Sequence, residues 1–467
     1  MIKLIHRVAL FASIVVLAVG SISAQNIQST EVEQIQQEEQ GDEFVPLSEL
    51  KPLEIDHDIV NKHILDGGLT ASNTYYVDST LKNNLYIGFY RPYLRYILNE
   101  THEFMARGKM TLKHYQKKPN TGKQTSTVGA LEVLQGRLNF GRHRVQVGRF
   151  FHRLGKGVLF SNYADGVEYS FLHPYFQAKV AGLYSAEYDK ACALSLQGCT
   201  TEANPYDIIP NVSADTKPKS AGKRAFGTIS LTSPALFGTR LYVLGLYSKD
   251  LIKDPSTGQK YAYNPWYAGG GLRGFIILPD LRYAVEGYYL GGKTHPKKGG
   301  TFKGSEEINI AAWAMQSEVK YTLPVLKDEI LPTLIAQYAM GSGDKDRASL
   351  SSASAQDKSG KDTSFYYFGV YSAGLALKPE LSNLQIMRFG FSLKPFQWTY
   401  DFRDVILVFK YSLYKKVIAE GVISDPLATE KNKDVGSAFD VSLIYKITSE
   451  LNLYYGFGYF IPGKAYP

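Results

Sequence analysis

The stretch FDVSLIYKITSELNLYYGFGYF, residues 439–460, decides the fold. Its first half alternates large apolar side chains with polar ones such as Asp440, Ser442 and Lys446. After a short turn at 448–450, the second half alternates in the same way and ends in a cluster of Tyr and Phe. Successive side chains of a strand point to opposite faces, so each half has one apolar and one polar face. An apolar face that ends in aromatic rings is typical of a strand that crosses a membrane.

The same alternation recurs along most of the chain. Segments with this pattern lie near residues 85–91, 103–114, 128–140, 142–150, 166–172, 175–185, 224–232, 239–248, 266–278, 281–291, 307–321, 330–340, 365–377, 383–394, 404–414, 435–447 and 451–460. Tight turns alternate with long polar loops, near residues 115–126, 151–165, 186–222, 249–264, 292–306 and 341–364. A sheet that crosses lipid must close so that no backbone group is left unpaired. We therefore predict an all-β, transmembrane antiparallel β-barrel of about 18 strands (16 to 18, with 18 if residues 70–98 supply another pair).

The N-terminus has the pattern of a secretory signal peptide. Two basic residues, Lys3 and Arg7, precede an apolar core from Val8 to Gly20 and small residues up to Ala24. No later apolar run approaches the length of about 18 residues that a spanning helix needs. The expected segments are a signal peptide (1–24), a polar periplasmic extension (25–69) and an outer-membrane β-barrel (70–467). Export combined with a barrel predicts the bacterial outer membrane; the alternative is a secreted soluble solenoid or sandwich.

The composition argues against several classes of function. The 34 Tyr and 24 Phe against 2 Cys are unlike a typical enzyme, and no Ser–His–Asp grouping or nucleophile turn is present. A mean hydropathy of −0.18 is compatible with a barrel because alternating strands average apolar and polar residues. The net charge of +8 requires a basic surface or lumen, but no nucleic-acid-binding motif accompanies it. We expect neither an enzyme nor nucleic-acid binding, and no cofactor.

Once the apolar face is assigned to lipid, the opposite face becomes the wall of a pore. A Lys or Arg that faced lipid at the midplane would cost about 2–4 kcal/mol, so basic side chains are expected to point inward. The predicted basic lining is Arg107, Lys109, Arg137, Arg144, Lys179, Arg282, Lys320, Arg388, Lys394 and Lys410. The predicted acidic lining is Glu132, Glu286, Glu318 and Asp440. These charges predict ion-pair ladders that brace a wide barrel, a positive path that favours anions, or both.

The polar segment 151–165 is a candidate for a loop that folds inward and narrows the pore. The candidate constriction residues are His152, Arg153, Lys156 and Asp165. The alternative is an ordinary surface loop.

Two further motifs point to binding or covalent chemistry. Residues 287–294, GYYLGGKT, match the phosphate-loop pattern, but they continue an alternating strand and no helix can begin after them. Cys192 and Cys199 share one long loop, and in an oxidising compartment we expect a disulfide between them. No His lies near these cysteines, and His57 with His63 is too sparse a set for a metal site, so no metal is expected.

Two short stretches are similar to known barrel families. The stretch GRLNFG at 136–141, followed by VQVGR at 145–149, resembles a recurring hairpin of Gram-negative specific porins. The stretch GFGYFIPG at 456–463 is similar to the last strand of alginate-export-like barrels. The order of strands and loops most resembles the Helicobacter outer-membrane (Hof-type) family, which is related in architecture to OprD-like porins. The resemblance implies an outer-membrane channel of about 18 strands and carries over no established substrate.

These features together predict an outer-membrane porin, through which small hydrophilic solutes diffuse with a modest bias towards anions. Two alternatives stay open: a surface-exposed adhesin built on a closed barrel, and an export channel for an acidic polysaccharide. The expected partners are outer-membrane lipid, lipopolysaccharide and the solutes themselves, with no nucleic acid. The sequence leaves open which solute passes and whether the barrel is a monomer or a trimer.

Overall fold

The protein is described from a computed structural model. It covers residues 63–78, 83–98, 101–115, 124–185, 224–251, 263–275, 280–294, 307–326, 329–347, 360–369, 371–377, 379–400, 402–425, 427–446 and 452–467. Within these ranges there is no helix with the length and apolarity needed to cross a membrane. The predicted signal peptide, most of the predicted extension, and both Cys192 and Cys199 lie outside the described residues.

The described residues form a single 18-stranded sheet. Its strands are β1 (His63–Asp78), β2 (Asn83–Leu98), β3 (His102–Tyr115), β4 (Gln124–Phe140), β5 (His143–Leu154), β6 (Phe160–His173), β7 (Phe176–Ser185), β8 (Arg224–Thr232), β9 (Thr239–Asp250), β10 (Tyr263–Phe275), β11 (Leu281–Thr294), β12 (Ile308–Thr322), β13 (Thr333–Gly341), β14 (Lys361–Asp362), β15 (Leu384–Leu393), β16 (Val405–Lys416), β17 (Asp434–Lys446) and β18 (Asn452–Pro462). The predicted all-β, antiparallel fold of about 18 strands is confirmed. The exception is β14, which has two residues and pairs in parallel with β12.

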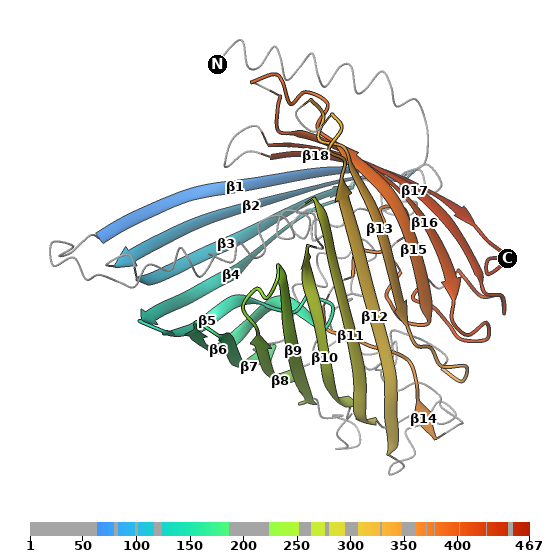
Figure 1. Cartoon of the computed structure of the whole chain (residues 1–467), viewed down its shortest axis with the longest axis horizontal. Coiled ribbons are helices and arrows are strands. Elements are labelled where there is room, and N and C mark those ends of the chain that lie inside the picture. The colour runs from blue at the N-terminus through green and yellow to red at the C-terminus, as the bar shows by residue number, and fades with distance from the viewer. Residues whose placement is uncertain are drawn as a thin grey trace.

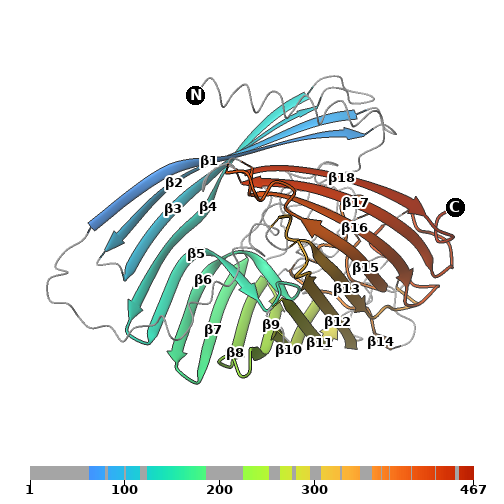
Figure 2. The ribbon, with the colours of Figure 1, turned by 45° about the horizontal axis from the view of Figure 1, so that its top comes forward.

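Strands that follow each other in the chain are neighbours in the sheet. Antiparallel ladders join β1 through β13 in order, then β13 to β15, and continue to β18. The sheet curls around an enclosed space, and β1 and β18 approach each other in both views (Figures 1 and 2). Among the described residues no ladder joins these two strands. The wall is therefore an up-and-down barrel whose seam lies between β1 and β18.

The connections between strands differ in length at the two rims of the barrel. At one rim, tight turns at 141–142 and 174–175 close hairpins, whereas at the other rim the connection 342–383 joins β13 to β15. The predicted membrane strand at 365–377 is wrong, because the chain there has no regular strand. With that strand removed, the loop 417–433 falls on the rim of the long connections, as an alternating barrel requires.

The N-terminal edge of the sheet begins earlier than the sequence suggested. β1 starts at His63, whereas the barrel was expected from residue 70. β1 contains Gly67 and Gly68 together with several small polar residues, so its alternation is weak. Its whole length nevertheless pairs with β2, from His63 opposite Leu98 to Asp78 opposite Asn83. Ladder hydrogen bonds with a neighbour, rather than an apolar face, identify this strand.

The hairpin that decided the fold pairs as its pattern predicts. Phe439 on β17 lies opposite Tyr459 on β18, and the two side chains are 51% and 45% exposed. Asp440, the next residue, is only 3% exposed because it points to the other face. The same apolar face carries Trp266 and Trp313, both exposed towards the rim of the long connections. We take this face as the one in contact with lipid.

The height of the apolar face can be judged on β12. Trp313 and Tyr321 lie on the same face of this strand. With about 3.4 Å per residue and a tilt of about 40°, the two rings are separated by about 20 Å along the barrel axis. This agrees with the apolar band of about 25 Å that outer-membrane barrels present between their aromatic girdles.

Candidate functional site

The β5–β6 hairpin leaves the barrel wall partway along its length. The β4–β5 ladder ends at Leu134 opposite Arg149, and the β6–β7 ladder ends at Asp165 opposite Tyr184. Beyond these points β5 and β6 pair with each other, up to Leu154 opposite Phe160, and Phe160 also forms a parallel bridge with Phe368. The hairpin turns into the space that the sheet encloses (Figure 2). Gly148 has a φ of +107° and faces Gly166 at the point of departure, where side chains would hinder the bend.

The tip of this hairpin contacts the opposite wall. The backbone N–H of Lys156 donates to both oxygens of Glu286 on β11, at 3.2 and 3.1 Å. The ammonium of Lys156 lies 3.7 Å from Glu318 on β12. A Cβ at Gly155 would overlap the Glu286 carboxylate, so only glycine permits this approach. Two of the predicted acidic lining residues therefore hold the predicted constriction segment.

The four predicted constriction residues occupy different parts of the hairpin. His152 is buried between Glu168, 2.8 Å from its Nδ1, and the Thr228 hydroxyl, 3.1 Å from its Nε2. Arg153 donates to the backbone oxygen of Lys156 at 2.8 Å and stiffens the tip. Asp165 lies at the base of the hairpin, where Arg149 donates to both of its oxygens. Only Lys156, of the four, reaches the far wall.

A second segment, residues 360–377, also fills part of the enclosed space. Phe368 and Gly369 donate their backbone N–H groups to Leu159 and Val158 of the hairpin tip, at 3.1 and 3.0 Å. Four consecutive aromatic residues, Phe365 to Phe368, are all at most 5% exposed. A membrane strand with one wet face could not bury every residue in this way. For this reason an apolar run that looked like a wall strand is instead a packed insertion.

The part of the 341–364 loop that is described lies in the same core and is not a solvated outer loop. Arg347 and Asp362 form an ion pair whose side chains are 1% and 4% exposed. The Arg347 guanidinium also lies over the ring of Tyr366, 3.7 Å from its centroid. The Tyr267 hydroxyl on β10 donates to the Tyr366 carbonyl at 2.9 Å. The insertion is thus fixed both to its own loop and to the wall.

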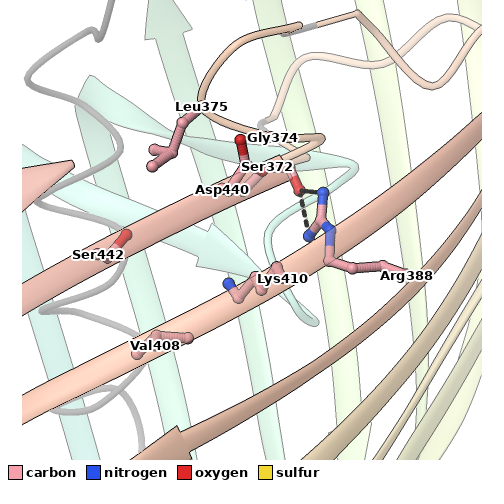
Figure 3. A pocket seen from close by; sticks show the side chains of 8 residues that line it. All are labelled: Ser372, Gly374, Leu375, Arg388, Val408, Lys410, Asp440 and Ser442. Carbon is pink, nitrogen blue, oxygen red and sulfur yellow. Dashed lines mark hydrogen bonds between the residues drawn. The ribbon is translucent and has the colours of Figure 1, made fainter. Parts of the chain in front are cut away.

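Arg388 on β15 anchors the end of the insertion (Figure 3). Its guanidinium donates to the Ser372 carbonyl at 3.0 Å and also to the Ala373 carbonyl, while its Nε donates to the Ser412 hydroxyl at 3.1 Å. Lys410 and Asp440 face each other across the β16–β17 ladder, beside the small pocket under the insertion (Figure 3). These predicted lining residues are therefore covered by residues 372–375.

The inner face of β2–β4 carries a different arrangement. Glu132 meets three basic side chains, Arg107 at 2.9 Å, Arg91 at 3.1 Å and Lys109 at 3.6 Å. Glu103 lies 2.9 Å from Arg95 and 3.0 Å from Arg137. Five basic side chains thus surround two carboxylates, which leaves an excess of positive charge on this wall. Sequence reasoning missed Arg91, Arg95 and Glu103.

The other predicted basic residues are spread around the barrel. Arg144 donates to Asn139 at 2.7 Å, and Lys179 lies opposite Ser230 in the β7–β8 ladder. Arg282 and Lys320 are opposite each other near the rim of tight turns, and Lys320 lies 3.2 Å from Glu318. Lys394 follows the end of β15 and lies 3.7 Å from Asp404, so it belongs to the turn 394–404. Of these residues, Arg144 lies close enough to Arg137 and Glu103 for their charges to interact, whereas Lys179, Arg282, Lys320 and Lys394 lie on β7, β11, β12 and the turn 394–404.

The phosphate-loop-like motif forms part of a wall strand. GYYLGGKT, residues 287–294, forms the end of β11, in line with its interpretation as a strand. Across the described ranges no three His, Cys, Asp or Glu side chains group closely enough to hold a metal ion.

Comparisons with known proteins agree with the barrel. A family model described as alginate export matches residues 242–467. The structure is similar to that of OccK8 (OprE) of Pseudomonas aeruginosa, with a TM-score of 0.51, 11% identity, and coverage of 86% of this chain and 94% of that chain. The chain has the fold of an OprD-like outer-membrane β-barrel. OccK1 (OpdK) of the same organism is similar at a TM-score of 0.49 and 10% identity, over 85% and 92% of the two chains. No protein with curated annotation matches the sequence.

Proposed function

We propose that this barrel is a porin of the Gram-negative outer membrane, through which small hydrophilic solutes diffuse with a modest preference for anions. The excess of basic side chains on the inner face of β2–β4 carries the proposal. Arg107 and Lys109 remain partly exposed beside Glu132, and Arg95 is 41% exposed beside Glu103. A wall with a net positive charge raises the local concentration of anions and steers them towards the passage.

The two insertions support a narrow passage rather than a wide one. The hairpin tip crosses towards β11 and β12, and residues 360–377 cover the wall formed by β15–β17. Aromatic rings such as Phe365 and Phe368 pack between the insertion and β8–β11, and the polar groups of that wall, such as Arg224 and Glu286, are fully buried. The path that remains for water and ions therefore runs along the charged β2–β4 wall. The ion pairs on that wall both brace the strands and bias the path.

One other function has a specific observation in its favour. The match to the alginate export family covers residues 242–467, and an acidic polysaccharide would also suit a positive lumen. Export of a polymer needs a continuous passage for a chain of linked sugars, whereas two insertions occupy this lumen. We therefore place diffusion of small solutes ahead of polysaccharide export. The Hof-type resemblance fits either function, because it carries over no substrate.

Swelling of liposomes that contain the purified protein tests the proposal. We expect swelling in small neutral and anionic solutes, with rates that fall steeply as solute size rises. Slower swelling in cations of matched size would reflect the basic wall. Barrels that insert but never admit solutes would favour the adhesin, and entry of long acidic oligosaccharides at rates close to those of monomers would favour polysaccharide export.

A further inference from the structure

Two facing strand edges are left without ladder partners where the β5–β6 hairpin leaves the wall. On β4, residues 124–133 pair with β3 on one side, and among the described residues no strand pairs with them on the other side. On β5, residues 150–154 pair with β6 only. Unpaired backbone N–H and C=O groups along an edge readily accept another strand. The two open edges belong to strands that are already paired just below the split.

The register below the split can be extended above it, past the irregularity at Glu132 in the β3–β4 ladder. Phe140 lies opposite His143, and the ladder runs up to Leu134 opposite Arg149. Continued by five residues, the same register would set Gly129 opposite Leu154. The facing glycines Gly148 and Gly166 supply a flexible point at the base, since Gly148 already adopts a positive φ. The wall therefore offers the hairpin a second place to lie.

A buried apolar core and several hydrogen bonds hold the hairpin in its inward position: Phe150, Leu154 and Leu159 are each at most 2% exposed. The Glu286 carboxylate accepts the Lys156 backbone N–H and also the Gln316 side-chain amide at 2.8 Å. Glu286 is fully buried, so these bonds are shielded from water. At the base, Arg149 donates at 3.2 Å to the Leu131 carbonyl, one of the acceptors on the open β4 edge. Arg149 thus occupies an acceptor that a wall-paired hairpin would need.

We propose that the β5–β6 hairpin is a two-position gate, held across the lumen by the positioning residue Glu286 and received by the open edge of β4 when that contact breaks. The inward position is the narrow state of the channel. The wall-paired position widens the passage beside the β2–β4 charges. The inference rests on the proposed function, because a gate needs a channel to control.

Single-channel recording of Glu286→Ala in planar bilayers tests the closed position. Loss of charge-assisted hydrogen bonds is expected to raise the ratio of wide to narrow states about ten-fold or more. Glu307→Gln is the matched control: it removes one carboxylate charge from an exposed pair with Lys293 at the outer end of the β11–β12 ladder, away from the hairpin. Its ratio of states should equal that of the unaltered protein. Equal ratios in all three proteins would overturn the gate and leave the channel intact, whereas absence of any conductance would count against the channel itself.

A cysteine pair tests the open position independently. Gly129→Cys with Leu154→Cys, in a chain with Cys192 and Cys199 replaced by Ser, joins the two edges only if the hairpin reaches β4. A Cβ at Gly129 meets no atom within 4 Å, so the substitution itself is tolerated. We expect the disulfide to form under mild oxidation and to hold the wide state until a reductant is added. Failure of the pair to cross-link, with or without Glu286→Ala, would refute the open position.

Discussion

The inner faces of β2–β4 and of β10–β16 differ in their surroundings, although both are built from alternating strands. On β2–β4 the inward positions carry ions, and Arg95 and Arg137 remain 41% and 34% exposed beside Glu103. On β10–β16 an insertion covers part of the inner face, and its rings pack against tyrosines of the wall. Alternation fixes which side chains point inward, but whether they meet water or a core depends on a segment far along the chain.

The energetics of the two walls should differ in the same way. Ion pairs that keep contact with water contribute little, because solvent screens them and the side chains lose freedom. A buried pair adds little when intact, but removal of one partner leaves an uncompensated charge at high cost. Substitutions on the covered wall should therefore affect stability, and substitutions on the open wall should affect ion flow.

The largest expected effect comes from Arg347→Ala in the covered region. The change leaves the buried Asp362 carboxylate without its partner and removes the cation over Tyr366. We therefore expect the free energy of unfolding to fall by about 3–5 kcal/mol. Denaturant unfolding in detergent, together with protease sensitivity of the insertion, measures this loss. A loss below about 1 kcal/mol would mean that the pair behaves like those on the open wall.

A smaller loss of stability is expected for Tyr267→Phe. The ring stays in place, but the buried Tyr366 carbonyl loses its donor, which typically costs about 1–3 kcal/mol. Tyr247→Phe, on the lipid-facing side of β9, removes a hydroxyl from a half-exposed ring and serves as the control. Unfolding midpoints should fall for the first variant and stay unchanged for the second. If both variants had the same unfolding midpoint, the hydrogen bond to the Tyr366 carbonyl would not contribute to holding the insertion.

On the open wall, Arg95→Ala should change stability by less than about 1 kcal/mol. Glu103 keeps its second partner, Arg137, so no buried charge is stranded. The same denaturant series measures this change beside Arg347→Ala. If the Arg95 variant lost as much stability as the Arg347 variant, the contrast between the two walls would disappear.

A pH dependence is expected in the connection that leads into β15. Burial raises the pKa of Glu380 to about 7, against an ordinary value of 4.5. The unfolded chain therefore releases this proton at a lower pH than the folded chain, so stability is full below about pH 4.5 and falls as pH rises towards 7. Hydrogen exchange at residues 379–383 across this range should show the weakening. Glu380→Gln should abolish the slope, and a slope that persists would assign the effect to another group.

Most strands could be predicted from the sequence because the alternation of apolar and polar residues that identifies them is local. Each residue of β17 and β18 contributes to an alternation that lies within about ten neighbours, and a membrane imposes that pattern on every strand. β1 was placed too late because Gly67 and Gly68 interrupt its pattern. Arg91 and Arg95 were missed because Pro92 breaks the polar and apolar order around them.

The insertions could not be predicted in the same way. Phe365 to Phe368 are as apolar as a wall strand, and only their burial on all sides, against the hairpin and β8–β11, reveals the difference. The segment 151–165 was a candidate for an inward loop because of its basic residues, but the partners of its tip, Glu286 and Glu318, lie more than a hundred residues away. Contacts of that kind depend on how the sheet curls and leave no local pattern.

The reversal potential of the purified protein in a planar bilayer, under a ten-fold KCl gradient, tests the central claim most directly. The account predicts a conducting channel whose potential has the sign of chloride selectivity. It further predicts that Arg107→Gln with Lys109→Gln moves this potential towards zero or beyond. A bilayer that stays silent, or a native channel that prefers potassium, would contradict a positively charged passage along β2–β4.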